Sequence, residues 1–310
     1  MRRARFCAAG LAGLVFAAPA GAAVLQAGAG KTYPLPSAAI AAAGAGDTVE
    51  IYPGQYFDCA TVHAPGVTIE GVGNAADVVI TDKACSGKGL LIVDAPDVTV
   101  KNLTLTRARV PDGNGAGIRM EGGSLTVDGV RFVNNQDGIL TAPDPHWVLT
   151  VRNSYFERDG YCGDYCAHGI YAAEIGRVIV DHSKFIRTRD GHSIKSRALA
   201  TEVTNCTIED GPDGNSSYAI ELPNGGALIA RGNHIEKGPK SGNHSAAIVL
   251  GSEGVTHPTP EIVVEDNDFT NDMDGHGTVL VNNQTATEAV LRGNVLHGEV
   301  RALQGDGSVN

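Results

Sequence analysis

The chain has 310 residues and a formal net charge of −11, with 40 glycines and only 5% aromatic residues. The acidic balance argues against a nucleic-acid-binding protein, because such proteins neutralise phosphates with lysine and arginine. An acidic polymer would therefore need a local basic site on this chain.

Residues 1–23 have the pattern of an export signal. Arg2, Arg3 and Arg5 precede an apolar run over 6–18, and small residues suited to cleavage follow at 19–23. The run is too short for a permanent membrane span, and no later stretch is long enough. We therefore expect an exported protein, periplasmic or secreted, whose net charge falls from −11 to −14 when the three arginines are removed.

Five cysteines remain once Cys7 leaves with the signal. In an oxidising compartment we expect two disulfides, Cys59–Cys85 and Cys162–Cys166, with Cys206 free and buried. A metal site at the second pair is the alternative, but the sequence offers no second ligand pair with matching spacing.

The rest of the chain predicts many short strands. Residues 36–44 predict a short alanine-rich helix that begins with proline, and 47–56 predict an opening strand. Runs rich in valine and isoleucine then alternate with asparagine, aspartate and glycine, which indicates an all-β chain without long helices. Aligned four-residue runs, from 117–120 to 247–250 and 278–281, recur in steps of 21 to 31 residues.

A second repeated unit lies between these runs and carries a small polar residue in one column. Stacked residues of this kind satisfy the turn amides of successive coils of a parallel sheet. The members of the column are Ser154, Ser183, Cys206, Asn233, Asn267 and Asn294.

This repeat resembles the right-handed parallel β-helix of the pectate-lyase-like superfamily, over residues 47 to 310. We expect a signal peptide over 1–23 and an N-terminal cap over 24–46, whose short helix covers the open end of the sheet. A single-stranded right-handed parallel β-helix domain over 47–310 follows. We expect the protein to be a monomer.

Titratable residues concentrate on three consecutive coils of the aligned repeat. Coils stack at about 4.8 Å, so residues in one column are in contact. The same columns on flanking coils carry mostly alanine, leucine, valine and glycine, which favours a site over a general solvated face. A simple Lys195–Glu221 pair with ordinary turn histidines is the alternative. The concentrated residues are His168, Tyr171, His192, Lys195, Arg197, Tyr218 and Glu221.

Enzymes of the resembled superfamily commonly cleave uronic-acid polysaccharides by β-elimination. That reaction must neutralise a carboxylate, remove the C5 proton and protonate the leaving O4. The resemblance therefore implies Arg197 as the carboxylate clamp, Lys195 as the leading base with His192 second, and Tyr171 or His168 as the proton donor.

The remaining candidates are assigned to substrate binding. Glu221 is expected to orient Lys195 or to bind a sugar hydroxyl, and Tyr218 lies beside it in the corner column. The loop over 159–167 directly precedes the site, and its Tyr161 and Tyr165 would form an aromatic sugar platform.

The sequence thus predicts an exported carbohydrate-active enzyme, foremost a lyase for an acidic polysaccharide. A uronate C5-epimerase, which shares the proton abstraction, and a non-catalytic glycan-binding or surface protein are the alternatives. No cofactor is required and no metal ligand is assigned. Calcium stays open, because loops 210–215 and 271–275 are rich in oxygen ligands, although turn chemistry explains both equally well.

Overall fold

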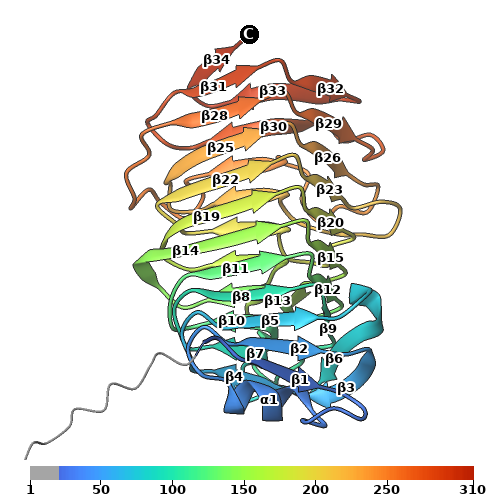
Figure 1. The fold of residues 1–310 in the computed structure, drawn as a ribbon. Helices are drawn as coiled ribbons and strands as arrows, with labels where there is room; N and C mark the ends of the chain where they lie inside the picture. The colour runs from blue at the N-terminus through green and yellow to red at the C-terminus, as the bar shows by residue number, and fades with distance from the viewer. Residues whose placement is uncertain (1–20) are drawn as a thin grey trace, which may run out of the picture.

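The computed structural model describes residues 21–310 and is a right-handed parallel β-helix (Figure 1). The expected signal peptide lies outside the described residues except for 21–23. Each of ten complete coils contributes one strand to each of three parallel sheets, and β1 and β34 extend the first sheet at its two ends. No helix in the described part of the chain is long and apolar enough to cross a membrane.

Twelve strands form the first sheet, in which neighbours along the stack are hydrogen-bonded. They are β1 (Val24–Ala27), β2 (Thr48–Ile51), β5 (Thr68–Gly71), β8 (Val98–Lys101), β11 (Leu125–Asp128), β14 (Asp144–Arg152), β19 (Ile175–Asp181), β22 (Ala200–Thr204), β25 (Ala227–Arg231), β28 (Ile262–Glu265), β31 (Ala289–Arg292) and β34 (Gly307–Val309).

Ten strands form a second sheet, here called the site sheet. They are β4 (Ala60–Val62), β7 (Gly89–Val93), β10 (Ala116–Met120), β13 (Asp137–Thr141), β18 (Ile170–Ala172), β21 (Ile194–Ser196), β24 (Ile220–Leu222), β27 (Ile248–Leu250), β30 (Thr278–Asn283) and β33 (Val300–Gln304).

The third sheet also has ten strands. They are β3 (Gly54–Asp58), β6 (Val78–Asp82), β9 (Thr104–Thr106), β12 (Arg131–Val133), β15 (Tyr155–Glu157), β20 (Lys184–Ile186), β23 (Thr207–Glu209), β26 (His234–Lys237), β29 (Asp268–Asn271) and β32 (Val295–His297).

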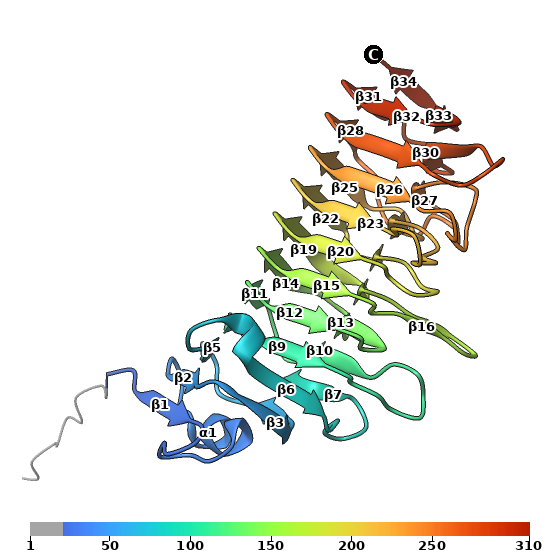
Figure 2. The same ribbon diagram turned by 90° about the vertical axis from the view of Figure 1, so that its right-hand side faces the viewer.

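Two short strands, β16 (Tyr161–Cys162) and β17 (Cys166–Ala167), form an antiparallel hairpin outside the three sheets. Figure 2 shows this hairpin projecting from the side of the stack. The Cys162–Cys166 disulfide joins its strands, and Cys59–Cys85 joins two segments near the N-terminal end. Cys206 is free and buried.

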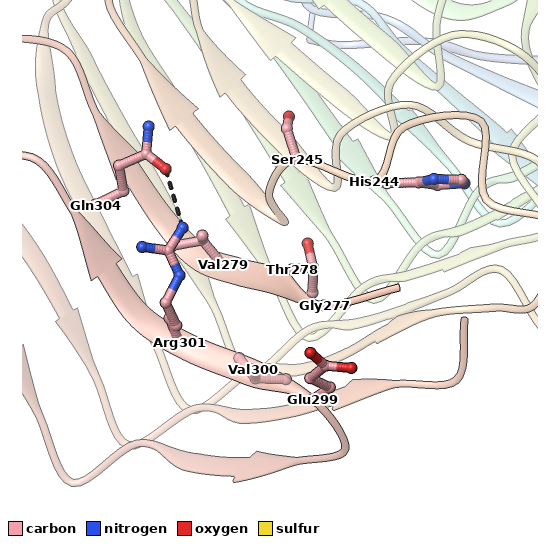
Figure 3. Close-up of a pocket in the computed structure, with 9 residues that line it drawn as sticks. All are labelled: His244, Ser245, Gly277, Thr278, Val279, Glu299, Val300, Arg301 and Gln304. Atoms are coloured by element: carbon pink, nitrogen blue, oxygen red, sulfur yellow. Dashed lines mark hydrogen bonds between the residues drawn. The ribbon is translucent and has the colours of Figure 1, made fainter. Parts of the chain in front are cut away.

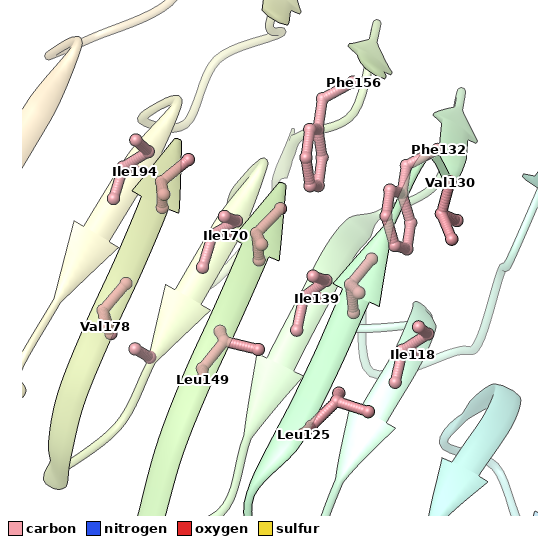
Figure 4. Packing of buried hydrophobic residues seen from close by; sticks show 14 of the residues in the cluster. Ile118, Leu125, Val130, Phe132, Ile139, Leu149, Phe156, Ile170, Val178 and Ile194 are labelled. Carbon is pink, nitrogen blue, oxygen red and sulfur yellow. The ribbon is translucent and has the colours of Figure 1, made fainter. Parts of the chain in front are cut away.

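Identical or similar apolar side chains stack from coil to coil in the core. In the site sheet Ile118 pairs with Ile139, and the ladder continues through Ile170 and Ile194 (Figure 4). In the third sheet three phenylalanine rings, Phe132, Phe156 and Phe185, stack with centroids 4.5 and 4.4 Å apart. One column of the sequence therefore becomes one ridge of the core.

The predicted register is wrong at the last of the aligned runs. The alignment placed Val279 opposite Ile248, but Ile248 pairs with Val281. All six residues of β30 are buried, so a shift by two keeps every side chain on its own face. An alternation-based alignment cannot detect such a shift.

The polar column forms a buried hydrogen-bonded ladder at one corner. The side-chain oxygen of Asn267 accepts from the backbone N–H of Asn233 at 3.0 Å and from its side-chain amide at 2.9 Å, and Asn294 repeats both bonds to Asn267. In several coils the residue just before the polar column has a left-handed backbone conformation, for example Asn205 at φ 53° and Asp266 at φ 56°. Asparagine and aspartate tolerate this conformation better than most residues, which explains their use there.

The N-terminal end is closed by the helix α1 (Pro36–Ala42), whose Ile40 and Ala39 are buried against the first coils. A short 3-10 helix, η1 (Ala75–Asp77), is the other helical element among residues 21–310. Strand β1 precedes α1 and already pairs in parallel with β2, so the first sheet begins within the segment expected to be the cap.

Candidate active site

Three strands of the site sheet bring the central residues of the predicted site together. Tyr171 on β18 is the pairing partner of Lys195 on β21, which in turn pairs with Glu221 on β24. Since one coil separates each pair, the three side chains form one row. Arg197 follows directly after the last residue of β21, at the edge of the site sheet where its strands end.

Both cations of the site are engaged by carboxylates. Lys195 Nζ lies 3.1 Å from Glu221 Oε2 and 2.7 Å from Glu253 Oε1. Arg197 Nη2 lies 2.6 Å from Glu253 Oε2, so the Glu253 carboxylate bridges the two cations. Arg197 also donates from Nε to the Tyr171 hydroxyl at 3.0 Å and from Nη1 to the side chain of Asn224.

The sequence analysis missed Glu253 and Asn224. Both lie in turns just past the ends of β27 and β24, where the strand alignment no longer says which way a side chain points. The available signal was position: each follows a strand aligned with β21, and so belongs to the edge of the sheet that carries Arg197.

Two histidines form a stacked pair with defined hydrogen bonds. His168 Nδ1 accepts from the backbone N–H of His192 at 2.9 Å, and His192 Nδ1 accepts from that of Tyr218 at 3.0 Å. The rings of His168 and His192 lie 4.7 Å apart and nearly parallel. The neutral rings therefore carry their proton on Nε2, as assigned from these bonds.

The two histidines differ in what Nε2 can do. Burial lowers the pKa of His168 well below 6.5, and the nearby His192 adds to this, so His168 is neutral. His192 Nε2 lies 3.0 Å from Glu221 Oε2, without the geometry of a hydrogen bond. Nδ1 of His192 accepts from the Tyr218 N–H and Nε2 faces the Glu221 carboxylate, so this geometry does not favour His192 as the base.

Glu221 is a buried anion that holds its neighbours in place. Burial by itself would raise its pKa, but the adjacent His192 ring and the positive charge of Lys195 lower it to about 2. Its other oxygen accepts from Ser252 Oγ at 2.7 Å. With 4% of its surface exposed, Glu221 is placed to orient Lys195 rather than to reach a sugar.

An open hollow of about 390 Å³, here called the site hollow, lies above these side chains. The hairpin contributes Tyr165 and Cys166 to its wall, and Tyr165 is 86% exposed. Tyr161 and Tyr218 do not line it: Tyr161 lines a neighbouring hollow, and Tyr218 stacks on His192 at 5.1 Å. The residues that line the site hollow are Tyr165, Cys166, His168, Tyr171, His192, Lys195, Arg197 and Glu253.

A separate hollow of about 380 Å³ lies further along the stack, between β30 and β33 (Figure 3). Its arginine, Arg301, donates to Gln304 at 3.2 Å, and Glu299 lies nearby on its wall. None of the site residues predicted from the sequence lines this hollow.

The oxygen-rich loops are used for turn structure. Asp210 is buried and accepts from the backbone N–H groups of Ser216 and Gly238. Asn271 donates to the carbonyls of His276 and Glu299. Over residues 21–310, no three His, Cys, Asp or Glu side chains are grouped so as to hold a metal ion.

The coiled parallel sheets and the row of polar residues on one of them define a right-handed β-helix protein with a surface site. Residues 144–308, more than half of the chain, match the family model described as the right handed beta helix region. The chain belongs to this family. No curated protein matches the chain.

Several solved structures share the fold at low sequence identity. An alginate lyase from Paenibacillus sp. str. FPU-7 is 15% identical, with 90% of this chain and 99% of that chain covered and a TM-score of 0.54. A pectin methylesterase from Aspergillus niger is 12% identical, with 94% and 92% covered and a TM-score of 0.47. The mannuronan C-5 epimerase A-module of Azotobacter vinelandii is 14% identical, with 89% and 94% covered and a TM-score of 0.43. At these identities the likeness shows the fold alone.

Proposed function

We propose that the protein is a polysaccharide lyase that cleaves a uronate-containing polymer by β-elimination outside the cytoplasm. The observation that carries the proposal is the bridged pair of cations next to a tyrosine hydroxyl, at the floor of an open hollow. The two disulfides support an exported location, since such bonds persist in oxidising compartments.

The first requirement of the reaction is a site for the substrate carboxylate. Glu253 already holds a carboxylate between Lys195 Nζ and Arg197 Nη2, at 2.7 and 2.6 Å. A uronate carboxylate that takes this position meets the same two donors. Neutralising its charge there stabilises the anion that forms when C5 loses its proton.

The second requirement is a group that carries the proton. Lys195 Nζ donates to Glu253 at 2.7 Å and forms an ion pair with Glu221 at 3.1 Å, which suits a clamp better than the base expected from the sequence. The hydroxyl oxygen of Tyr171 accepts from Arg197 Nε at 3.0 Å, which holds the hydroxyl beside the two cations that would bind the substrate carboxylate. We therefore assign the proton transfer to Tyr171.

The proposed step requires the deprotonated hydroxyl of Tyr171 as the base. The Tyr171 phenolate takes the C5 proton, the electron pair forms the C4=C5 double bond, and the C4–O4 bond breaks. The leaving oxygen takes the proton from Tyr171, which restores the phenolate. The neutral His168 also lines the hollow and is the second candidate for the final proton donor.

The test follows unsaturated product by ultraviolet absorbance on a panel of uronate polymers. Tyr171→Phe and Lys195→Ala should each lower the rate at least about 100-fold, the lower range for acid–base groups. Tyr155→Phe is the matched control, because this tyrosine lies on the third sheet and bonds to Glu157. Binding without product on every polymer would contradict the lyase, and exchange of the C5 proton with deuterated water would then identify an epimerase.

A further inference from the structure

A second hollow, here called the side hollow, shares a wall with the site hollow. Tyr165, Cys166 and Tyr171 line both. Its volume is about 240 Å³. This lies below the roughly 300–1,000 Å³ of pockets that take drug-sized ligands, and suits a single sugar ring. A polymer held over Tyr171 would therefore place its neighbouring residue in the side hollow.

The two hollows differ in charge. The site hollow contains Lys195 and Arg197, whereas no lysine, arginine or histidine lines the side hollow. Asp112 and Asp137 contribute its carboxyl groups. A uronate carboxylate placed there would lose water and meet carboxyl groups without a compensating cation, which is unfavourable.

Arg119 is the nearest cation along the row, and burial raises the pKa of Asp137 by more than the charge of Arg119 lowers it. Arg119 is the pairing partner of Leu140, one coil beyond the side hollow. Its Nε lies 3.2 Å from Glu121 Oε1, and Arg119 is not part of the wall. The side hollow therefore has no cation for a second carboxylate.

Asp137 points to a hydroxyl-bearing ligand. It is only 1% exposed, and its Oδ1 accepts from the backbone N–H of His168 at 2.6 Å. Its Oδ2 has no hydrogen-bond partner among the described residues. Burial raises the pKa of Asp137 to about 8, so the carboxyl is largely protonated at neutral pH and can both donate to and accept from a sugar hydroxyl.

The rest of the wall fits the apolar faces of a sugar ring. Leu140 lies on the outward row between Arg119 and Tyr171, and Tyr165 and Tyr171 also line the side hollow. Aromatic and aliphatic surfaces of this kind bind the C–H faces of sugars, while Asn114 offers both a donor and an acceptor.

Resting on the proposed function, we propose that the side hollow is a subsite for an uncharged sugar residue next to the uronate. The substrate is then a heteropolysaccharide in which uronates adjoin neutral sugars, rather than a polymer of uronates alone.

The test compares oligomers that differ only in charge. Oligomers of galacturonate, glucuronate and alginate are titrated calorimetrically, before and after about half of their carboxylates are reduced to primary alcohols. The wild type should bind the half-reduced form of a recognised oligomer about tenfold more tightly than the fully charged form. Asp137→Asn, which keeps the acceptor for the His168 N–H, should reduce this preference.

A charge placed in the side hollow gives the decisive comparison. Leu140→Lys supplies the missing cation and should reverse the preference, while Val295→Lys adds the same charge at an exposed position on the third sheet and should not. Thermal unfolding confirms that each variant is folded. The subsite proposal is overturned if the wild type binds fully charged oligomers as tightly as half-reduced ones, or more tightly, and Leu140→Lys does not change this preference.

The cleavage assay separates this inference from the proposed function. Tight binding of half-reduced oligomers without any unsaturated product overturns the lyase and supports the subsite. Product formation with a preference for fully charged oligomers supports the lyase and overturns the subsite.

Discussion

Replacing Glu253 by glutamine removes the internal carboxylate that occupies the proposed position of the substrate carboxylate. Glu253 bridges Lys195 and Arg197, and its side chain is 43% exposed. Partial burial by itself would raise the pKa of Glu253, but hydrogen bonds from the two cations lower it, so it competes as an anion. A substrate that binds the same cations must first displace it.

The expected gain is estimated from Glu253, the more exposed partner in both ion pairs. Exposed pairs are each worth about 0.2–1 kcal/mol, so the two contacts together resist displacement by about 1 kcal/mol. Glu253→Gln should therefore bind a uronate oligosaccharide about fivefold more tightly. The affinity for the same oligosaccharide with all carboxylates reduced should stay as in the wild type.

Calorimetric titration of both oligosaccharides measures this effect. Glu174→Gln is the control, since Glu174 is an exposed carboxylate just after β18 that makes no hydrogen bond or ion pair within residues 21–310. Weaker binding of the uronate by Glu253→Gln would refute the reasoning, because Glu253 would then organise the two cations instead of occupying their ligand position.

Two further predictions concern stability. Asn267→Ala removes the acceptor for the two N–H groups of Asn233 and the donor to the Ala230 carbonyl. At about 1 kcal/mol for each buried group left unpaired, the free energy of unfolding measured in urea should fall by about 3 kcal/mol. A loss below about 1 kcal/mol would show that water replaces the ladder. Burial raises the pKa of Asp137 to about 8 in the folded state. The stability that its neutral carboxyl gives the folded protein is therefore complete below the unfolded pKa of about 3.9 and is lost as pH rises to about 8. The thermal midpoint of the wild type should fall relative to that of Asp137→Asn between about pH 4 and about pH 8, and parallel curves would contradict the buried, protonated carboxyl.

The sequence alone was sufficient for the β-helix and for the central row of the site. Parallel coils place equivalent residues side by side, so a repeated isoleucine column becomes a core ridge and Tyr171, Lys195 and Glu221 become neighbours. The same logic predicted the polar corner ladder, because stacked turns need the same hydrogen bonds in every coil.

The tertiary structure decided what lies between and beyond the strands. The turns after β24 and β27 place Asn224 and Glu253 in contact with Arg197. The sequence repeat does not predict these contacts, because the turns differ in length from coil to coil. The hydrogen bonds that fix the histidine tautomers also depend on backbone groups of the next coil. Strand pairing repeats in every coil, so aligned sequence positions predict it. The protonation states and hydrogen-bond partners of the site residues depend on contacts between turns, which only the folded chain brings together.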